Sequence, residues 1–249
     1  MEYLPENWSN QLTIEVAVRY LPLLKYLQNK NIDLCRFGTL PLEVLAQQKN
    51  LSLSEIRACL LNALPPTQQD SMAHWRKAPC LSRLIERIEQ VFHRSLSREL
   101  REIEQLFQIV LENHGETSAD YADLHLAYHE LALSTQAHMN TEEENIFPVM
   151  RFLDYCFQKS QPLPVLPGGS IQDLIDRLEH EHVYAEKKML SFKDLSNNFS
   201  RLSDECPVVK LIYTRIIHME QSLKDHIFVE NQILNPMALK IENHLRALA

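Results

Sequence analysis

HMNTE (residues 138–142) and HIFVE (residues 226–230) repeat one spacing, in which a histidine is followed four residues later by a glutamate. In an α-helix, residues i and i+4 lie on the same face about 6 Å apart along the axis. An imidazole and a carboxylate placed in this way can reach one metal ion or an adjacent pair of ions. One such pair would carry little information, but two copies predict helices that present metal ligands.

The composition of the chain favours an all-α fold. Of its 249 residues, 45% are hydrophobic and 23% are charged, which is ordinary for a soluble globular protein. Only 4 residues are glycine, whereas strand-rich folds and phosphate-binding loops need more of them. The sequence therefore predicts long helices joined by few turns, and its 11 histidines require a separate explanation.

The N-terminal part has the pattern of a small helical domain followed by a proline-led linker. Apolar residues recur at helical spacing through residues 11–63, and Ser52 with Glu55 forms an S-x-x-E capping box. The stretch LPPTQQDS at residues 64–71 suits neither helix nor strand, so we place a domain boundary there. The predicted domains are residues 1–70 and 71–249.

Four long helical patterns follow this linker and predict an antiparallel four-helix bundle. They are separated by the stretch NHG at residues 113–115, by the proline- and glycine-containing residues 162–169, and by the residues before Pro207. No strand is required anywhere in the pattern. The four predicted helices cover residues 79–113, 120–155, 170–197 and 207–247.

Charge and segment composition limit the partners and the compartment. A formal net charge of −8 without any Lys/Arg-rich run argues against nucleic acid. No stretch approaches the roughly 18 apolar residues that a membrane helix needs, and the first residues do not resemble a signal peptide. The five cysteines lack C-x-x-C spacing and signal neither a disulfide framework nor a zinc–thiolate site. We therefore expect a cytoplasmic protein with no membrane partner.

The distance of each histidine from the nearest loop indicates which histidines can meet. His93 and His138 each lie about 20 residues, or roughly 30 Å at 1.5 Å per residue, from the first loop. His182 and His226 are similarly matched across the last loop, and roughly a dozen residues separate His138 and His182 from the loop between them. The four histidines are therefore expected at one level of an antiparallel bundle.

The two glutamates, each one turn from its histidine, would complete a dinuclear site by bridging two metal ions. Imidazole and carboxylate ligands without thiolates suit iron or manganese, although the ligand types alone do not exclude zinc. Any one of the histidines, taken alone, would more often be an exposed or a hydrogen-bonded core residue. The predicted metal ligands are His93, His138, Glu142, His182, His226 and Glu230.

Several other histidines are predicted to lie outside this site. His114 falls roughly 30 Å from His93 on a continuous helix, so we expect it at the end of the bundle beside the helix C-terminus. His180 is two residues from a predicted ligand and faces another direction. The pair His125 and His129 is expected to be exposed.

These residues make the chain resemble the hemerythrin-like family, and within it the di-iron proteins for repair of iron centres, also described as iron-sulfur cluster repair proteins. Residues 137–148 and 225–236 are similar to the family's two signature segments. Phe92-His93 and Glu181-His182 resemble its other ligand positions, which also places Glu181 near the site. The stretch DLCRFG at residues 33–38 resembles the small ScdA-type domain that precedes the bundle, so the resemblance covers nearly the whole chain.

Two positions depart from the family's pattern. Its small domain usually carries adjacent cysteines followed by glycines, whereas only Cys35 and Gly38 remain here, which argues against thiol-pair chemistry. A lone helical cysteine such as Cys35 is more often buried than reactive. Asn235 replaces an aromatic residue before Pro236, which is a change of packing.

The resemblance implies a cytoplasmic protein that restores iron-sulfur clusters damaged by nitrosative or oxidative stress, by donating iron from an oxo-bridged centre of two iron ions. The ligand set is smaller than that of an oxygen-carrying hemerythrin, so open positions would favour binding of nitric oxide or oxygen and release of iron. The alternatives are reduction of nitric oxide to nitrous oxide, and an oxygen- or NO-sensing or iron-storage module. Expected partners are damaged iron-sulfur proteins, and a homodimer is compatible with this interpretation.

Overall fold

A computed structural model gives the fold of this chain. It describes residues 8–11, 13, 16–17, 20–61, 75, 77–114, 119–163, 165–166, 169–202 and 206–247. Every regular element within these residues is a helix, as the composition predicted, and none of these helices is long and apolar enough to cross a membrane. The predicted linker at 64–71 lies outside the described residues.

Contacts within the chain divide it into two compact units. The first contains Met1–Pro66, Leu100–Leu126 and Lys193–Ile217. The second contains Thr67–Glu99, Ala127–Phe192 and His218–Ala249. Each unit therefore includes both N-terminal and C-terminal parts of the sequence.

The N-terminal residues of the first unit form short helices around a small apolar core. The Ser52 hydroxyl accepts a hydrogen bond from the backbone N–H of Glu55 at 3.3 Å, which confirms one half of the predicted capping box. Asn31 and Asn50 have φ values of 54° and 53°, the left-handed conformation that commonly ends a helix. The α-helices are α2 (Leu21–Asn29), α3 (Leu34–Phe37), α4 (Leu42–Gln48) and α5 (Leu53–Leu61), and a 3-10 turn, η1, covers Trp8–Asn10.

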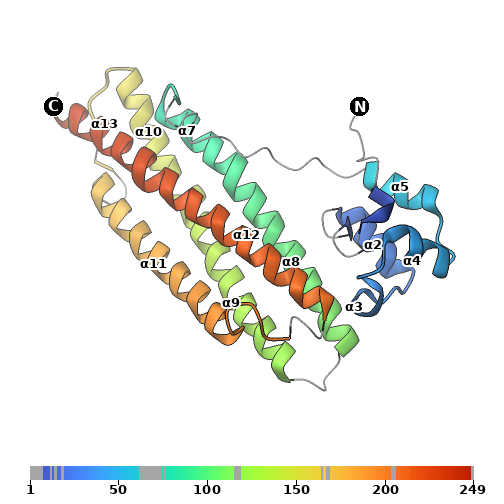
Figure 1. The fold of residues 1–249 in the computed structure, drawn as a ribbon. Coiled ribbons are helices and arrows are strands. Elements are labelled where there is room, and N and C mark those ends of the chain that lie inside the picture. Colours follow the sequence, from blue (N-terminus) through green and yellow to red (C-terminus); the bar gives the residue numbers. More distant parts are fainter. Residues whose placement is uncertain are drawn as a thin grey trace. The chain divides into compact units, whose positions relative to one another are not determined.

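The four predicted long helices are present, and segments of all four lie side by side in the second unit (Figure 1). Three of them contain a π-helical turn, and the third, α11 (Ile171–Leu195), is continuous. The first comprises α7 (Leu81–Ile88), η2 (Glu89–His93) and α8 (Arg94–His114). The second comprises α9 (Ala119–Thr141), η4 (Glu142–Ile146) and α10 (Phe147–Gln158). The fourth comprises α12 (Pro207–Val229), η5 (Glu230–Leu234) and α13 (Asn235–Ala247).

Two of the π turns precede a proline by two residues. Pro148 follows η4 and Pro236 follows η5. A proline inside a helix lacks the amide hydrogen and clashes with the carbonyl four residues earlier, and a wider turn before it relieves the clash. The third turn, η2, has no proline in the residues that follow it, but it ends on His93. All three π turns thus begin or end on a predicted metal ligand, which is a common place for such turns.

Two buried carboxylates join helices of the second unit at their ends. Asp154 in α10 accepts a hydrogen bond from the backbone N–H of Ser82, the second residue of α7, at 3.0 Å. Glu242 in α13 accepts one from the backbone N–H of Ile171, the first residue of α11, at 3.2 Å. The first N–H groups of a helix have no partner within the helix, so these carboxylates act as caps supplied by another helix.

We expect replacement of Asp154 by alanine to lower the free energy of unfolding by about 1–2 kcal/mol, because the capped N–H of Ser82 loses its partner. Although burial opposes ionisation, the hydrogen bonds from Ser82 and Gln158 lower the pKa of Asp154 below its usual value of 3.8. This contribution is therefore present above pH 3.8 and is lost as the pH falls through the lowered pKa. Urea denaturation of wild type and variant at pH 7 and pH 3 measures the contribution of Asp154 to the free energy of unfolding. An equal loss of stability in the exposed control Asp123→Ala would contradict the assignment of Asp154 as a cap.

Candidate metal centre

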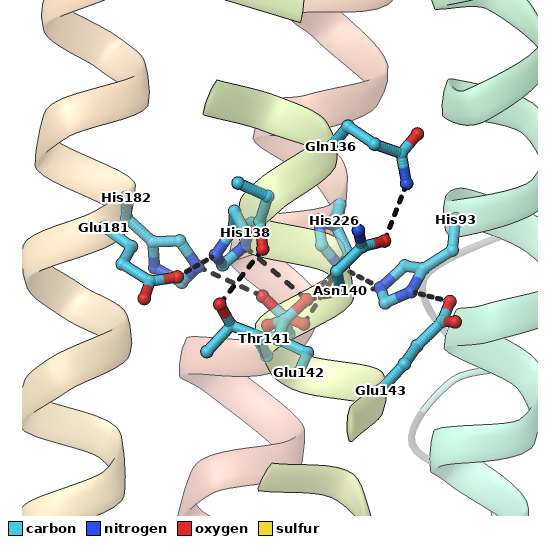
Figure 2. A network of polar contacts seen from close by, with 12 residues as sticks. His93, Gln136, His138, Asn140, Thr141, Glu142, Glu143, Glu181, His182 and His226 are labelled. Atoms are coloured by element: carbon cyan, nitrogen blue, oxygen red, sulfur yellow. Dashed lines mark hydrogen bonds and ion pairs between the residues drawn. The ribbon is translucent and has the colours of Figure 1, made fainter. Parts of the chain in front are cut away.

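The structure brings together all six residues that the sequence nominated as metal ligands. Figure 2 labels His93, His138, Glu142, His182 and His226. They come from all four long helices and belong to the second compact unit. Each is buried, with at most 4% of its surface exposed. The candidate ligands are His93 at the end of η2, His138 in α9, Glu142 in η4, His182 in α11, His226 in α12 and Glu230 in η5.

The six side chains form two overlapping groups of four. One histidine pair, His93 and His226, has its ring centroids 4.9 Å apart, and the other, His138 and His182, has them 4.7 Å apart. Each pair forms a group with the same two carboxylates, Glu142 and Glu230, and within each group the potential ligand atoms lie within 4.8 Å of one another. Two histidine pairs that share two carboxylates provide the donor set for two adjacent metal ions.

The imidazoles all turn the same nitrogen toward the carboxylates. The Nε2 atoms of His93 and His138 lie 3.3 and 3.5 Å from Oε2 of Glu142. The Nε2 atom of His182 lies 3.3 Å from Oε2 of Glu230, and that of His226 lies 2.9 Å from Oε1 of the same residue. This convergence leaves the Nδ1 atoms of the four histidines directed away from Glu142 and Glu230.

The hydrogen bonding of these buried atoms is incomplete in a way that a cation would correct. Both oxygens of Glu142 and of Glu230 lack a hydrogen-bond partner, as do the Nε2 atoms of His138 and His182. In the described part of the chain, the ion pairs of the two carboxylates are all with histidines. Buried carboxylates without compensating charge are strongly unfavourable. The residues therefore fit bound metal ions, which would satisfy both the charge and the free lone pairs.

Burial keeps the histidines in the form that binds metals. Burial, followed by the effect of the neighbouring His226, lowers the pKa of His93 to about 4. Burial also lowers the pKa of His138, in opposition to its hydrogen bond with Glu181. Neutral imidazole is the ligating form, so both rings are ready to bind metal at neutral pH.

The two carboxylates have opposite pKa shifts because they are close to each other. Burial, followed by the charge of Glu230, raises the pKa of Glu142 well above its usual value. Burial also opposes ionisation of Glu230, but the charge of His226 and the adjacent side chains of His182 and Glu142 hold its pKa well below the usual value. The two carboxylates therefore do not ionise independently, and bound cations would favour the ionised form of both.

Two outer carboxylates hold one histidine of each pair by its Nδ1 atom. Oε1 of Glu143 lies 2.7 Å from Nδ1 of His93, and Oε2 of Glu181 lies 3.0 Å from Nδ1 of His138 (Figure 2). An Nδ1–H that donates to a carboxylate fixes the tautomer and directs Nε2 toward the centre. Glu181 was expected near the site, whereas Glu143 was missed, although its position directly after Glu142 was a visible signal.

We expect Glu143→Ala to weaken metal binding by about 10–100-fold, because His93 would lose the partner that orients its ring and raises its basicity. Competition with a chelator of known affinity measures the change. Glu144→Ala is the matched control, because Glu144 is the next residue along the chain and its side chain is exposed. Equal affinities of the two variants would show that Glu143 does not support the centre.

The other histidines divide into confirmed and wrong predictions. His114 is the last residue of α8, as expected, and His180 and His129 are exposed, as expected. The prediction for His125 was wrong, because this residue is half-buried and its Nε2 lies 2.7 Å from Oε1 of Glu104. The spacing within one helix did not reveal the carboxylate on another helix that partners this histidine.

Comparisons with known proteins agree with this arrangement. The sequence matches the family described as "Hemerythrin HHE cation binding domain" over residues 85–238. It is 29% identical over 237 residues to the "Probable iron-sulfur cluster repair protein" of Haemophilus influenzae, covering 94% of this chain and 98% of that protein. It is 28% identical over 214 residues to the "Iron-sulfur cluster repair protein YtfE" of Musicola paradisiaca, covering 85% and 88% of the two chains.

A relative with a different name matches over a similar length at lower identity. The "Iron-sulfur cluster repair protein ScdA" of Staphylococcus haemolyticus is 22% identical over 228 residues, covering 91% of this chain and 97% of its own. The family match extends over more than half of this chain, and its range includes every member of the buried histidine and glutamate cluster. The chain therefore belongs to the hemerythrin HHE cation-binding family.

Proposed function

We propose that this protein is a di-iron protein that repairs iron-sulfur clusters damaged by nitrosative or oxidative stress, by donating iron to them. The observation that carries the proposal is the pair of buried carboxylates shared by two histidine pairs. The names of the three relatives support it, because each is called an iron-sulfur cluster repair protein. The proposed clients are therefore proteins whose iron-sulfur clusters have lost iron.

In this proposal each half of the cluster holds one iron ion. His93 and His226 would ligate one ion and His138 and His182 the other, while Glu142 and Glu230 would bridge both. When bound, two adjacent iron ions supply exchangeable ferrous iron and two-electron redox capacity. The protein orients the ligands through Glu143 and Glu181 and excludes bulk water through burial.

The number of protein ligands favours release over permanent storage. Each half of the cluster provides two imidazoles and a share of two carboxylates. This set leaves coordination positions for water or small molecules such as nitric oxide, and open positions allow ligand exchange. The five cysteines are free thiols, which agrees with the reducing cytoplasm that we propose as the site of action.

The test is the repair of a damaged iron-sulfur enzyme in vitro. A purified [4Fe–4S] dehydratase inactivated by nitric oxide is incubated anaerobically with this protein after loading with ⁵⁷Fe. We expect recovery of dehydratase activity together with transfer of the isotope, and loss of both with His138→Ala. His180→Ala is the control, because His180 is an exposed histidine outside the cluster.

Two outcomes would contradict the proposal. If His138→Ala leaves the recovery of dehydratase activity unchanged, the histidine and glutamate cluster is not responsible for repair. Formation of nitrous oxide from nitric oxide in a single turnover, without isotope transfer, would instead assign the centre to nitric oxide reduction.

A further inference from the structure

A second group of potential ligands lies in the first compact unit and contains the thiols that the histidine and glutamate cluster lacks. It consists of Cys35 in α3, His114 at the end of α8, and Cys206 immediately before α12. One potential ligand atom from each of the three lies within 4.8 Å of the others. The three residues are far apart in the sequence, so only the fold brings them together, and the cysteine spacing gave no signal of it.

The position of Cys206 favours its thiolate form. The residue is completely buried, its carbonyl accepts the backbone N–H of Lys210 at 3.2 Å, and it precedes the first residue of α12. A hydrogen bond with Cys35, followed by bonds from the backbone N–H of Val209 and from His114, lowers the pKa of Cys206 to about 6 in spite of burial. Backbone N–H groups and the positive end of a helix stabilise a thiolate.

Cys35 provides the proton of this hydrogen bond. The bond to Cys206, followed by burial, raises the pKa of the Cys35 thiol. At neutral pH the pair therefore consists of one thiol that donates and one thiolate that accepts. Thiolates are the metal-binding form of cysteine, so one strong ligand is already prepared.

His114 supplies a third donor with a defined orientation. Its ring stacks on Tyr121, with centroids 4.7 Å apart and an interplanar angle of 23°. One imidazole nitrogen lies within 4.8 Å of the Cys206 sulfur, and His114 contributes to the lowered pKa of that thiol. A disulfide would need only the two cysteines, whereas a metal site uses all three residues.

We propose that Cys35, His114 and Cys206 bind one borderline-soft divalent transition-metal ion, of the class of Zn²⁺ or Fe²⁺. The bound cation would displace the proton of Cys35 to solvent, and the resulting two thiolates and one imidazole suit such ions and leave one tetrahedral position open. With bond lengths of about 2.0–2.3 Å, donor atoms on one tetrahedral ion lie roughly 3.5–4 Å apart. Separations of at most 4.8 Å therefore require only small adjustments of the side chains.

Cobalt titration of the reduced, full-length protein under anaerobic conditions tests this proposal. Cobalt bound to thiolate gives an intense charge-transfer band in the near ultraviolet, which a centre of imidazoles and carboxylates cannot produce. We expect the final intensity of this band to correspond to one thiolate-bound cobalt ion per chain, in addition to any cobalt in the histidine and glutamate cluster. It should disappear in Cys35→Ser and Cys206→Ser, and His114→Ala should weaken the binding at least tenfold.

Cys59→Ser is the matched control, because Cys59 is also a half-buried cysteine of the N-terminal helices but does not belong to the group. This variant should retain the band. The thermal unfolding midpoint of each variant shows whether it has folded. A second measurement uses only the wild type, so it does not depend on the folding of any variant. Bound Zn²⁺ should protect the half-buried Cys35 from alkylation while Cys59 still reacts, as determined by mass spectrometry.

Three results would overturn the proposal. The reduced wild type could give no thiolate-to-cobalt band, the band could survive replacement of both Cys35 and Cys206, or zinc could leave the alkylation of Cys35 unchanged. Because the assay detects thiolate ligation, each of these results leaves the repair proposal for the histidine and glutamate cluster standing.

Discussion

Removing the metal ions is expected to lower the thermal unfolding midpoint of this protein by roughly 8–16 °C. A ligand present at 1,000 times its dissociation constant stabilises the folded state by about 4 kcal/mol, and each kcal/mol shifts the midpoint of a chain of this size by about 2–4 °C. The physical reason is that Glu142 and Glu230 are completely buried and have no cationic partner other than histidine in the described structure.

Calorimetry of chelator-treated protein, before and after anaerobic reconstitution with ferrous iron, measures this shift. The control is the double variant Glu142→Gln with Glu230→Gln, in which iron should leave the midpoint nearly unchanged. If iron still changes the midpoint of this variant, the change comes from iron bound outside the histidine and glutamate cluster. Equal midpoints for stripped and reconstituted wild type would mean that the buried carboxylates are not metal ligands.

The same double variant is expected to lose at least nine-tenths of its bound iron and, in the metal-free state, to be more stable than the metal-free wild type. The first effect follows from the loss of both bridging carboxylates, which serve each histidine pair. The second follows because a neutral amide costs less to bury than a carboxylate without a counter-charge, a difference on the order of 1–4 kcal/mol. The two effects have opposite signs, which a variant that merely damages the fold cannot reproduce.

Elemental analysis of the purified protein gives the iron content, and urea denaturation of the stripped proteins gives the free energy of unfolding. Glu186→Gln, on an exposed glutamate of α11, is the control for removal of a negative charge and should change neither quantity. A double variant that retains iron, or one that is less stable than the wild type when both are stripped, would contradict the assignment.

Regular helical geometry explains why much of the fold and of the cluster could be predicted. The first long helix was expected over residues 79–113, and its parts run from Leu81 to His114. Because each residue of a helix adds a fixed rise of about 1.5 Å, counting residues to the loops was enough to bring four histidines to one level. Their rings and the two glutamates are now seen in one buried cluster.

The features that could not be predicted depend on contacts between helices or on small changes in helical winding. A π turn adds one residue to a turn and hardly alters the apolar pattern, so η2, η4 and η5 were not foreseen. The partner of Glu143 lies 50 residues away in the sequence. Cys35, His114 and Cys206 come from three separate segments, and local spacing contains no information about such meetings.

Glu143 and Glu181 connect a buried centre to its surroundings. Their side chains remain 46% and 37% exposed, yet each carboxylate holds a histidine that is almost completely buried. A docking protein that paired its own lysine or arginine with either carboxylate would draw negative charge away from that histidine and make it a poorer donor. In the proposed repair function, a client that bound at this outer surface would therefore weaken the binding of iron without reaching the metal itself.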